Sequence, residues 1–98
     1  MLFYADDNDF RSKVLKNKDT VLVDFFADWC SPCQMISPVV EDIAQKHNVC
    51  KINVDTSPVT AKMYNIKSIP TLIVIKNGDM TDHIVGYAEK EQILNMLE

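Results

Sequence analysis

Two cysteines separated by two residues, Cys30 and Cys33, follow an apolar run over residues 21–27. If a helix begins here, the two side chains lie one turn apart on the same face, close enough to form a disulfide. A disulfide that closes so short a loop removes little entropy from the unfolded chain, so it stabilises a fold only weakly. The spacing therefore indicates a redox couple or a metal site rather than a structural cross-link.

The two cysteines are expected to play unequal parts. Pro32 suits the first turn of a helix, because its missing N–H would have no partner there. Free N–H groups and the positive end of the helix dipole stabilise a thiolate at that place, so we expect Cys30 to be the exposed nucleophile. Cys33, one turn further in, is expected to be the more buried resolving thiol, which attacks a mixed disulfide. The alternative is that both are simply small buried residues.

Asp24 interrupts the apolar strand that precedes the cysteines and shares a face with Leu22 and Phe26. Burying an unpaired carboxylate is costly, and burial should raise its pKa. Such a carboxylate could accept the proton of Cys33 as that thiol attacks. The residues also allow a hydrogen bond to a helix cap, or pairing with Lys51 on the neighbouring strand, where Lys51 could instead tune Asp24.

Hydrophobic periodicity and turn signals predict the elements that position these residues. The expected strands are residues 2–4, 20–27, 49–54, 71–76 and 81–85. The expected helices run from about 8 to 17, 32 to 47 (with a kink at Pro38), 58 to 64 and 89 to 97. This order, β-α-β-α-β-α-β-β-α, implies parallel crossovers first, and Asn77-Gly78 predicts an antiparallel hairpin.

Composition limits the class of protein. The 98 residues are expected to form one domain, 1–98, and a hydrophobic fraction of 47% can supply its core. A net charge of −4 and scattered basic residues argue against a nucleic-acid partner. No run reaches the ~20 apolar residues that cross a membrane, and the N-terminus does not resemble a secretory signal. Three cysteines, an odd number, do not suit a secreted disulfide scaffold, so we expect a cytoplasmic protein.

Ile69-Pro70 precedes the expected strand 71–76. Only about 5–6% of X–Pro bonds in folded proteins are cis, so this dipeptide alone predicts a trans bond.

Residues 24–33 resemble the active-site signature of the thioredoxin family. Pro38 and the segments 51–55, 69–72, 76–78 and 85–86 follow in the order and spacing of that family, so the resemblance covers essentially the whole chain. It implies an α/β thioredoxin fold, a central mixed sheet of about five strands flanked by about four helices.

The resemblance also implies a function, protein disulfide reduction by reversible exchange at a Cys30–Cys33 disulfide. In that case Asp24 is the buried proton acceptor, Lys51 is its neighbour, and Pro70 is cis and faces the cysteines. A shallow apolar groove would bind client proteins, with the client backbone pairing with Ile69 and with Gly86 allowing close approach. The implied groove residues are Trp29, Pro32, Ile69, Pro70, Val85 and Gly86.

The implied partners are disulfide-containing cytosolic proteins and a thioredoxin reductase that uses flavin and NADPH. The chain itself is expected to bind no cofactor or metal and to be a monomer. Its differences from the family pattern remove no chemical group; they are Phe26, Ser31, Asn65, Ser68 and Tyr87. Ser31-Pro32 adds at most a hydroxyl donor between the cysteines, so we expect a potential near the roughly −270 mV of thioredoxins rather than the about −120 mV of the periplasmic oxidant.

Other functions fit parts of the pattern. Cys30, Cys33, His47 and Cys50 resemble a zinc ligand set, but a helix rising ~1.5 Å per residue would put His47 about 20 Å from Cys33. A thioredoxin-fold binding or scaffold protein without turnover is the main alternative, and an oxidase or isomerase in an oxidising compartment is another. Cys50 is expected to be an inert core residue.

Overall fold

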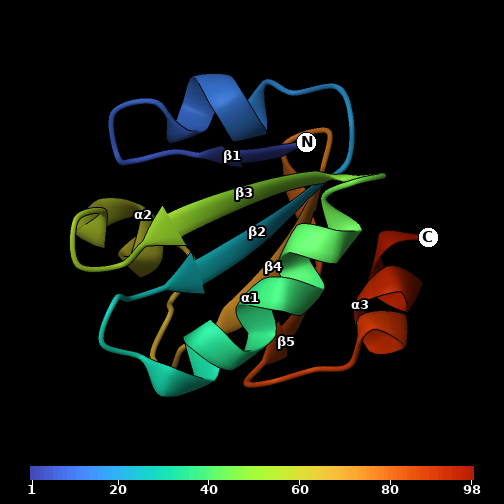
Figure 1. Cartoon of the computed structure of the whole chain (residues 1–98). Coiled ribbons are helices and arrows are strands. Elements are labelled where there is room, and N and C mark those ends of the chain that lie inside the picture. Colours follow the sequence, from blue (N-terminus) through green and yellow to red (C-terminus); the bar gives the residue numbers. More distant parts are fainter.

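A computed structural model describes all 98 residues, whose elements follow the predicted order (Figure 1). The strands are β1 (Leu2–Tyr4), β2 (Val21–Phe26), β3 (Asn48–Asn53), β4 (Thr71–Lys76) and β5 (Asp79–Val85). The helices are η1 (Arg11–Leu15), α1 (Ser31–Ile43), α2 (Pro58–Met63) and α3 (Lys90–Leu97).

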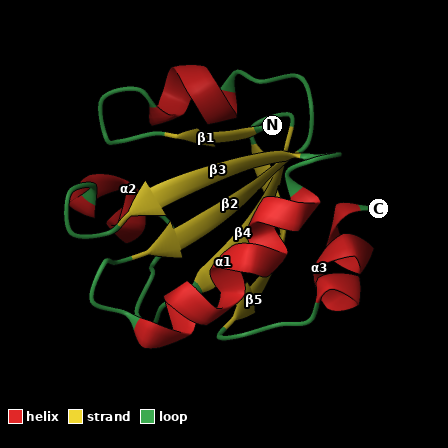
Figure 2. Ribbon diagram, viewed as in Figure 1, coloured by secondary structure: helices red, strands yellow, loops and turns green.

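The five strands form one mixed sheet in the order β1-β3-β2-β4-β5 (Figure 2). The helical crossovers make β1, β3 and β2 parallel, and β4 pairs antiparallel with both β2 and β5. The β2–β3 register sets Asp24 opposite Lys51. The central position of β2 explains why its sequence is apolar on both faces.

Each face of the sheet has its own apolar cluster. Phe10 and Val14, from the η1 region, pack against Val23 and Phe25 on one face. On the other face, α1 and α3 pack over Leu22, Leu72 and Val74; their buried contacts are Ile36, Val40, Ile43 and Ile93. Since side chains alternate along a strand, Asp24 lies on the same face as Leu22, beneath α1.

The hairpin between β4 and β5 is the two-residue turn predicted from Asn77-Gly78. Both residues have positive φ, 52° and 84°, as a type I′ turn requires. A Cβ atom on Gly78 would also lie 3.1 Å from the carbonyl oxygen of Leu15. Because the turn is so tight, Lys76 pairs directly with Asp79, and β5 begins two residues before the predicted start at 81.

Two helices are shorter than predicted. The first was expected to run to residue 17, but η1 is a five-residue π-turn closed by a bond from Lys16 N to Arg11 O. The second ends at Ile43 instead of residue 47, because Gln45 and Lys46 form i→i−3 turns instead of continuing the α-helical ladder. None of the helices is long and apolar enough to cross a membrane.

Candidate active site

Cys30 and Cys33 form a disulfide at the start of α1, with their Cα atoms 5.3 Å apart. Cys30 occupies the N-cap, with extended backbone, and its Sγ accepts a hydrogen bond from the N–H of Cys33 at 3.2 Å. Pro32 lies in the first turn, where a missing N–H costs nothing. The sulfur of Cys30 therefore lies where the helix presents a free donor and its positive end.

The expected difference in exposure between the two cysteines is wrong for the disulfide form. Cys30 is 4% exposed and Cys33 is 6% exposed. Cys30 is covered because its Sγ lies 3.8 Å from the carbonyl oxygen of Ile69, and Ile69 packs on the small cluster around the disulfide. The two cysteines differ in hydrogen bonding and not in exposure, because only Cys30 Sγ accepts a backbone N–H bond.

The Ile69-Pro70 peptide bond is cis. The trans bond predicted from the dipeptide alone is therefore wrong, and the cis bond implied by the family resemblance is found. Pro70 is buried, and its carbonyl oxygen accepts a hydrogen bond from the N–H of Gly86 at 2.8 Å. This bond joins the loop before β4 to the residue after β5, beside the disulfide.

Among the predicted groove residues, Trp29 and Val85 expose large apolar side chains, whereas Pro70 is buried. Trp29 is 71% exposed and Val85 is 56% exposed. Gly86 has φ +89°, and a Cβ built there meets nothing within 4 Å, so the space above it is open. The indole Nε1 of Trp29 donates to Oδ2 of Asp55 at 2.9 Å, a contact that the sequence did not predict.

Asp24 is 1% exposed, and its Oδ1 has no hydrogen-bond partner. Burial raises its pKa to about 6, although the charge of Lys51 opposes that rise. Neither of the bonds considered from the sequence is present: Asp24 does not cap a helix, and Lys51 does not form an ion pair with it. Lys51 instead donates to Ser37 Oγ at 3.4 Å, and its ammonium lies 4.8 Å from the ring centroid of Phe26.

The residues of the hypothetical zinc set lie apart. His47 lies beyond the end of α1, whereas the disulfide lies at its start. Cys50 is fully buried in the core beneath η1, on the other face of the sheet, and burial raises its pKa to about 12. No three His, Cys, Asp or Glu side chains are grouped so that they could hold a metal ion.

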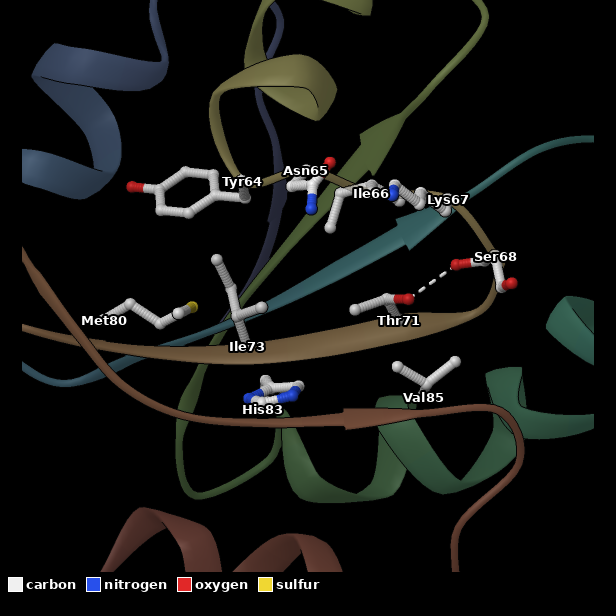
Figure 3. A pocket seen from close by; sticks show the side chains of 10 residues that line it. All are labelled: Tyr64, Asn65, Ile66, Lys67, Ser68, Thr71, Ile73, Met80, His83 and Val85. Atoms are coloured by element: carbon white, nitrogen blue, oxygen red, sulfur yellow. Dashed lines mark hydrogen bonds between the residues drawn. The ribbon is translucent and has the colours of Figure 1, made fainter.

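A pocket of about 400 Å³ lies between the loop after α2 and the hairpin β4–β5, and Val85 of the predicted groove lines it (Figure 3). Thr71 Oγ1 donates to the carbonyl oxygen of Ser68 at its rim, at 2.5 Å. Neither cysteine lines it, so we do not assign it to the redox site. Sequence reasoning gave no sign of this pocket, because its residues come from a loop and two strands without a shared motif.

Comparison with known proteins gives a consistent result. The model of the thioredoxin family matches residues 1–98. Thioredoxin 1 of Synechococcus elongatus is 44% identical over 96 residues, covering 94% of this chain and 90% of that protein. The thioredoxin of Staphylococcus epidermidis is 45% identical over 96 residues, covering 94% of this chain and 90% of that protein.

The fold agrees with this match. The crystal structure of the reduced Schistosoma mansoni thioredoxin pre-protein aligns with a TM-score of 0.89 and 37% identity, covering 98% of this chain and 94% of that chain. Thioredoxins are thiol-disulfide oxidoreductases that carry their redox group as a cysteine pair. The chain therefore belongs to the thioredoxin family, and as a member it is a protein disulfide reductase with Cys30–Cys33 as its redox group.

Proposed function

We propose that Cys30, Cys33 and Asp24 divide the steps of disulfide reduction. The Cys30 thiolate attacks one sulfur of a client disulfide, forms a mixed disulfide and releases the first client thiolate. The Cys33 thiol then passes its proton to Asp24 and attacks Cys30 Sγ. The Cys30–Cys33 bond forms, the second client thiolate leaves, and the client has gained two electrons and takes up two protons.

The observation that carries this assignment is the hydrogen bond from Cys33 N–H to Cys30 Sγ at the helix start. A donor aimed at a sulfur favours its thiolate, and the thiolate is the attacking species. Cys33 lies within the first turn and has no such donor, which suits a thiol that must first lose a proton. Asp24 supports that step because it is buried and its Oδ1 is unpaired.

The groove supports a protein rather than a small-molecule substrate. Ile69 lies outside the strands, and neither its N–H nor its carbonyl group bonds to another backbone group. Its carbonyl oxygen lies 3.8 Å from Cys30 Sγ, so an extended client that paired with Ile69 would lie against the disulfide. Trp29, Pro32, Pro70, Val85 and Gly86 would line the rest of this contact.

The finer assignments extend the family relationship. We place the protein in the cytoplasm as a monomer, recycled by a reductase that uses flavin and NADPH, with disulfide-containing cytosolic proteins as clients. The net charge of −4 supports protein partners over nucleic acid. Pro32 and Lys51 are assigned to tuning of the redox centre, and Ser31 to a small contribution at most.

Reduction of insulin by dithiothreitol tests the assignment. The native chain should accelerate the reaction and Cys30→Ser should abolish the acceleration. Reduced Cys33→Ser, freed of dithiothreitol and then mixed with insulin, should accumulate a covalent adduct with an insulin chain that added dithiothreitol releases. A binding or scaffold protein would give no acceleration. An adduct formed by Cys30→Ser but not by Cys33→Ser would reverse the roles.

A further inference from the structure

Lys51 lies opposite Asp24 in adjacent parallel strands, the register at which an ion pair would be expected. Asp24 is buried, and an unpaired buried carboxylate should attract the nearest cation. No ion pair forms between them, and Oδ1 of Asp24 has no partner. Something else therefore holds the ammonium group.

Two residues of α1 provide the other partner. Ser37 and Glu41 are one turn apart on the helix, and the Ser37 hydroxyl donates to Glu41 Oε2 at 3.0 Å. Because the hydroxyl proton is used in that bond, the lone pairs of Ser37 Oγ are free to accept from Lys51 Nζ, which lies 3.4 Å away. The bonds run from ammonium to hydroxyl to carboxylate, so a positive charge is linked to a negative one.

Aromatic rings complete the site around the ammonium. The Lys51 Nζ atom lies 4.8 Å from the ring centroid of Phe26 and 6.0 Å from that of Tyr4. Both distances fall within the range of cation–π attraction. Phe26 follows Asp24 by two residues on the same face, so the ring draws the ammonium along the strand rather than toward the carboxylate.

We propose that Ser37 and Glu41 are positioning residues that hold the Lys51 ammonium off Asp24 and so leave that carboxylate unpaired for the proton of Cys33. The proposal rests on the proton-acceptor role given to Asp24 above. An ion-paired Asp24 would be a weaker base, because a direct partner stabilises the charged form. The Ser37 hydroxyl bonds to Glu41 and to Lys51, so these two residues are placed to act on Asp24 through Lys51.

Few other charged groups face Asp24. From β3 the group is Lys51, whose charge acts on Asp24. From α1 it is Glu41, which is connected to Lys51 through Ser37. On β4 the residue paired with Asp24 is Leu72, which is apolar. A change in the titration of Asp24 in a Ser37 variant can therefore be traced to Lys51.

The test is an NMR titration of the Asp24 side-chain carboxyl carbon in the oxidised protein. Ser37→Ala frees Lys51 to approach, so the pKa of Asp24 should fall by about half a unit to one unit. Lys51→Met removes the cation, so the pKa should rise. The double variant should titrate like Lys51→Met alone. Ser12→Ala is the matched control, since Ser12 Oγ bonds to the carbonyl oxygen of Asp9, outside α1.

Three results would overturn the proposal: an unchanged or raised pKa in Ser37→Ala, a shift of equal size in Ser12→Ala, or a Ser37 effect that persists without Lys51. Glu41→Gln gives a second arm and should lower the pKa of Asp24 more than Glu91→Gln, which removes an exposed charge from α3. The titration needs no client, so it is independent of the assigned role. If Asp24→Asn resolves mixed disulfides at the native rate, the role fails while the positioning by Ser37 can still hold.

Discussion

The indole nitrogen of Trp29 donates to the carboxylate of Asp55 at 2.9 Å, which links the residue before Cys30 to the loop after β3. Trp29 is 71% exposed, so packing alone does little to hold the ring. The hydrogen bond fixes the orientation of the ring beside the disulfide. We infer that Asp55 preorganises the groove for its client.

Asp55→Ala is therefore expected to weaken client binding. The net contribution of such a bond is about 0.5–1.5 kcal/mol, so KM for insulin should rise about two- to tenfold with little change in kcat. The chain has one tryptophan, so its fluorescence anisotropy should report a more mobile Trp29. Asp28→Ala, at an exposed position whose side chain makes no hydrogen bond, is the control. Equal effects of the two substitutions would contradict the role of Asp55.

The buried Asp24 should make the protein less stable as pH rises. Its pKa is about 6 in the fold against 3.8 for an ordinary aspartate, so between these values the folded state binds more protons than the unfolded state. Stability then falls with rising pH across that window, and the loss is complete above about pH 6. Two units of pKa correspond to roughly 3 kcal/mol.

Urea denaturation of the native protein and of Asp24→Asn at pH 4 and pH 8 measures this effect. The free energy of unfolding of Asp24→Asn minus that of the native chain should be about 2–3 kcal/mol larger at pH 8 than at pH 4. A difference that stays constant would mean that Asp24 does not titrate with a raised pKa.

Asp7 is expected to stabilise α2 from a distant part of the sequence. Its carboxylate accepts from Thr60 N and Thr60 Oγ1, both at 2.7 Å, and from Val59 N at 3.1 Å. Desolvation raises the pKa of Asp7, but the bonds from Thr60 and Val59 outweigh it, so the pKa lies below 3.8. These bonds satisfy N–H groups at the start of a helix whose own N-cap side chain makes no such bond.

Asp7→Ala should accordingly lower the melting temperature at neutral pH. Because the pKa is depressed in the fold, the contribution of Asp7 is complete above the ordinary value of 3.8 and is lost as pH falls through the lower folded value. The gap between native and variant melting temperatures should therefore narrow in acid. Asp19→Ala, at an exposed site whose side chain makes no hydrogen bond, should leave the melting temperature unchanged. An equal fall in melting temperature in Asp19→Ala would argue against capping by Asp7.

Ser31 should have little influence on the redox potential. It is exposed, and its hydroxyl makes no hydrogen bond to either sulfur. Ser31→Gly should shift the potential by less than about 15 mV in equilibrium with glutathione, since 30 mV corresponds to about 1.4 kcal/mol. Ser31→His, which adds a cation near the thiolate, should raise the potential clearly more. Equal shifts in the two variants would show that the hydroxyl itself tunes the disulfide.

The sequence predicted the parts of this molecule that depend on local patterns. Strand β4 and the Asn77-Gly78 turn were predicted correctly because periodicity and turn chemistry act over a few residues. The burial of Asp24 was visible as a polar residue inside an apolar strand. The cis bond at Pro70 required the family resemblance, since the dipeptide alone favours trans.

The remaining features depend on tertiary contacts, which a single sequence does not encode locally. Burial of Cys30 depends on Ile69, which lies 39 residues away. The bond between Trp29 and Asp55 spans 26 residues. Ser37 and Glu41 could have been recognised as a helical pair, but nothing local connects them to Lys51. Helix α1 ends early because its last turn tightens, an effect that propensities do not resolve.

The two outer strands of the sheet also limit how other chains can approach. β1 has only three residues, and β5 carries Asp79, Asp82 and His83 and a register shift at its pairing with Val74 and Ile75. Short, charged and irregular edges discourage a foreign strand from extending a sheet. We infer that both edges of the sheet disfavour self-association. The backbone of Ile69, which bonds to no other backbone group and lies beside Cys30, is then the place where we propose that an extended client docks.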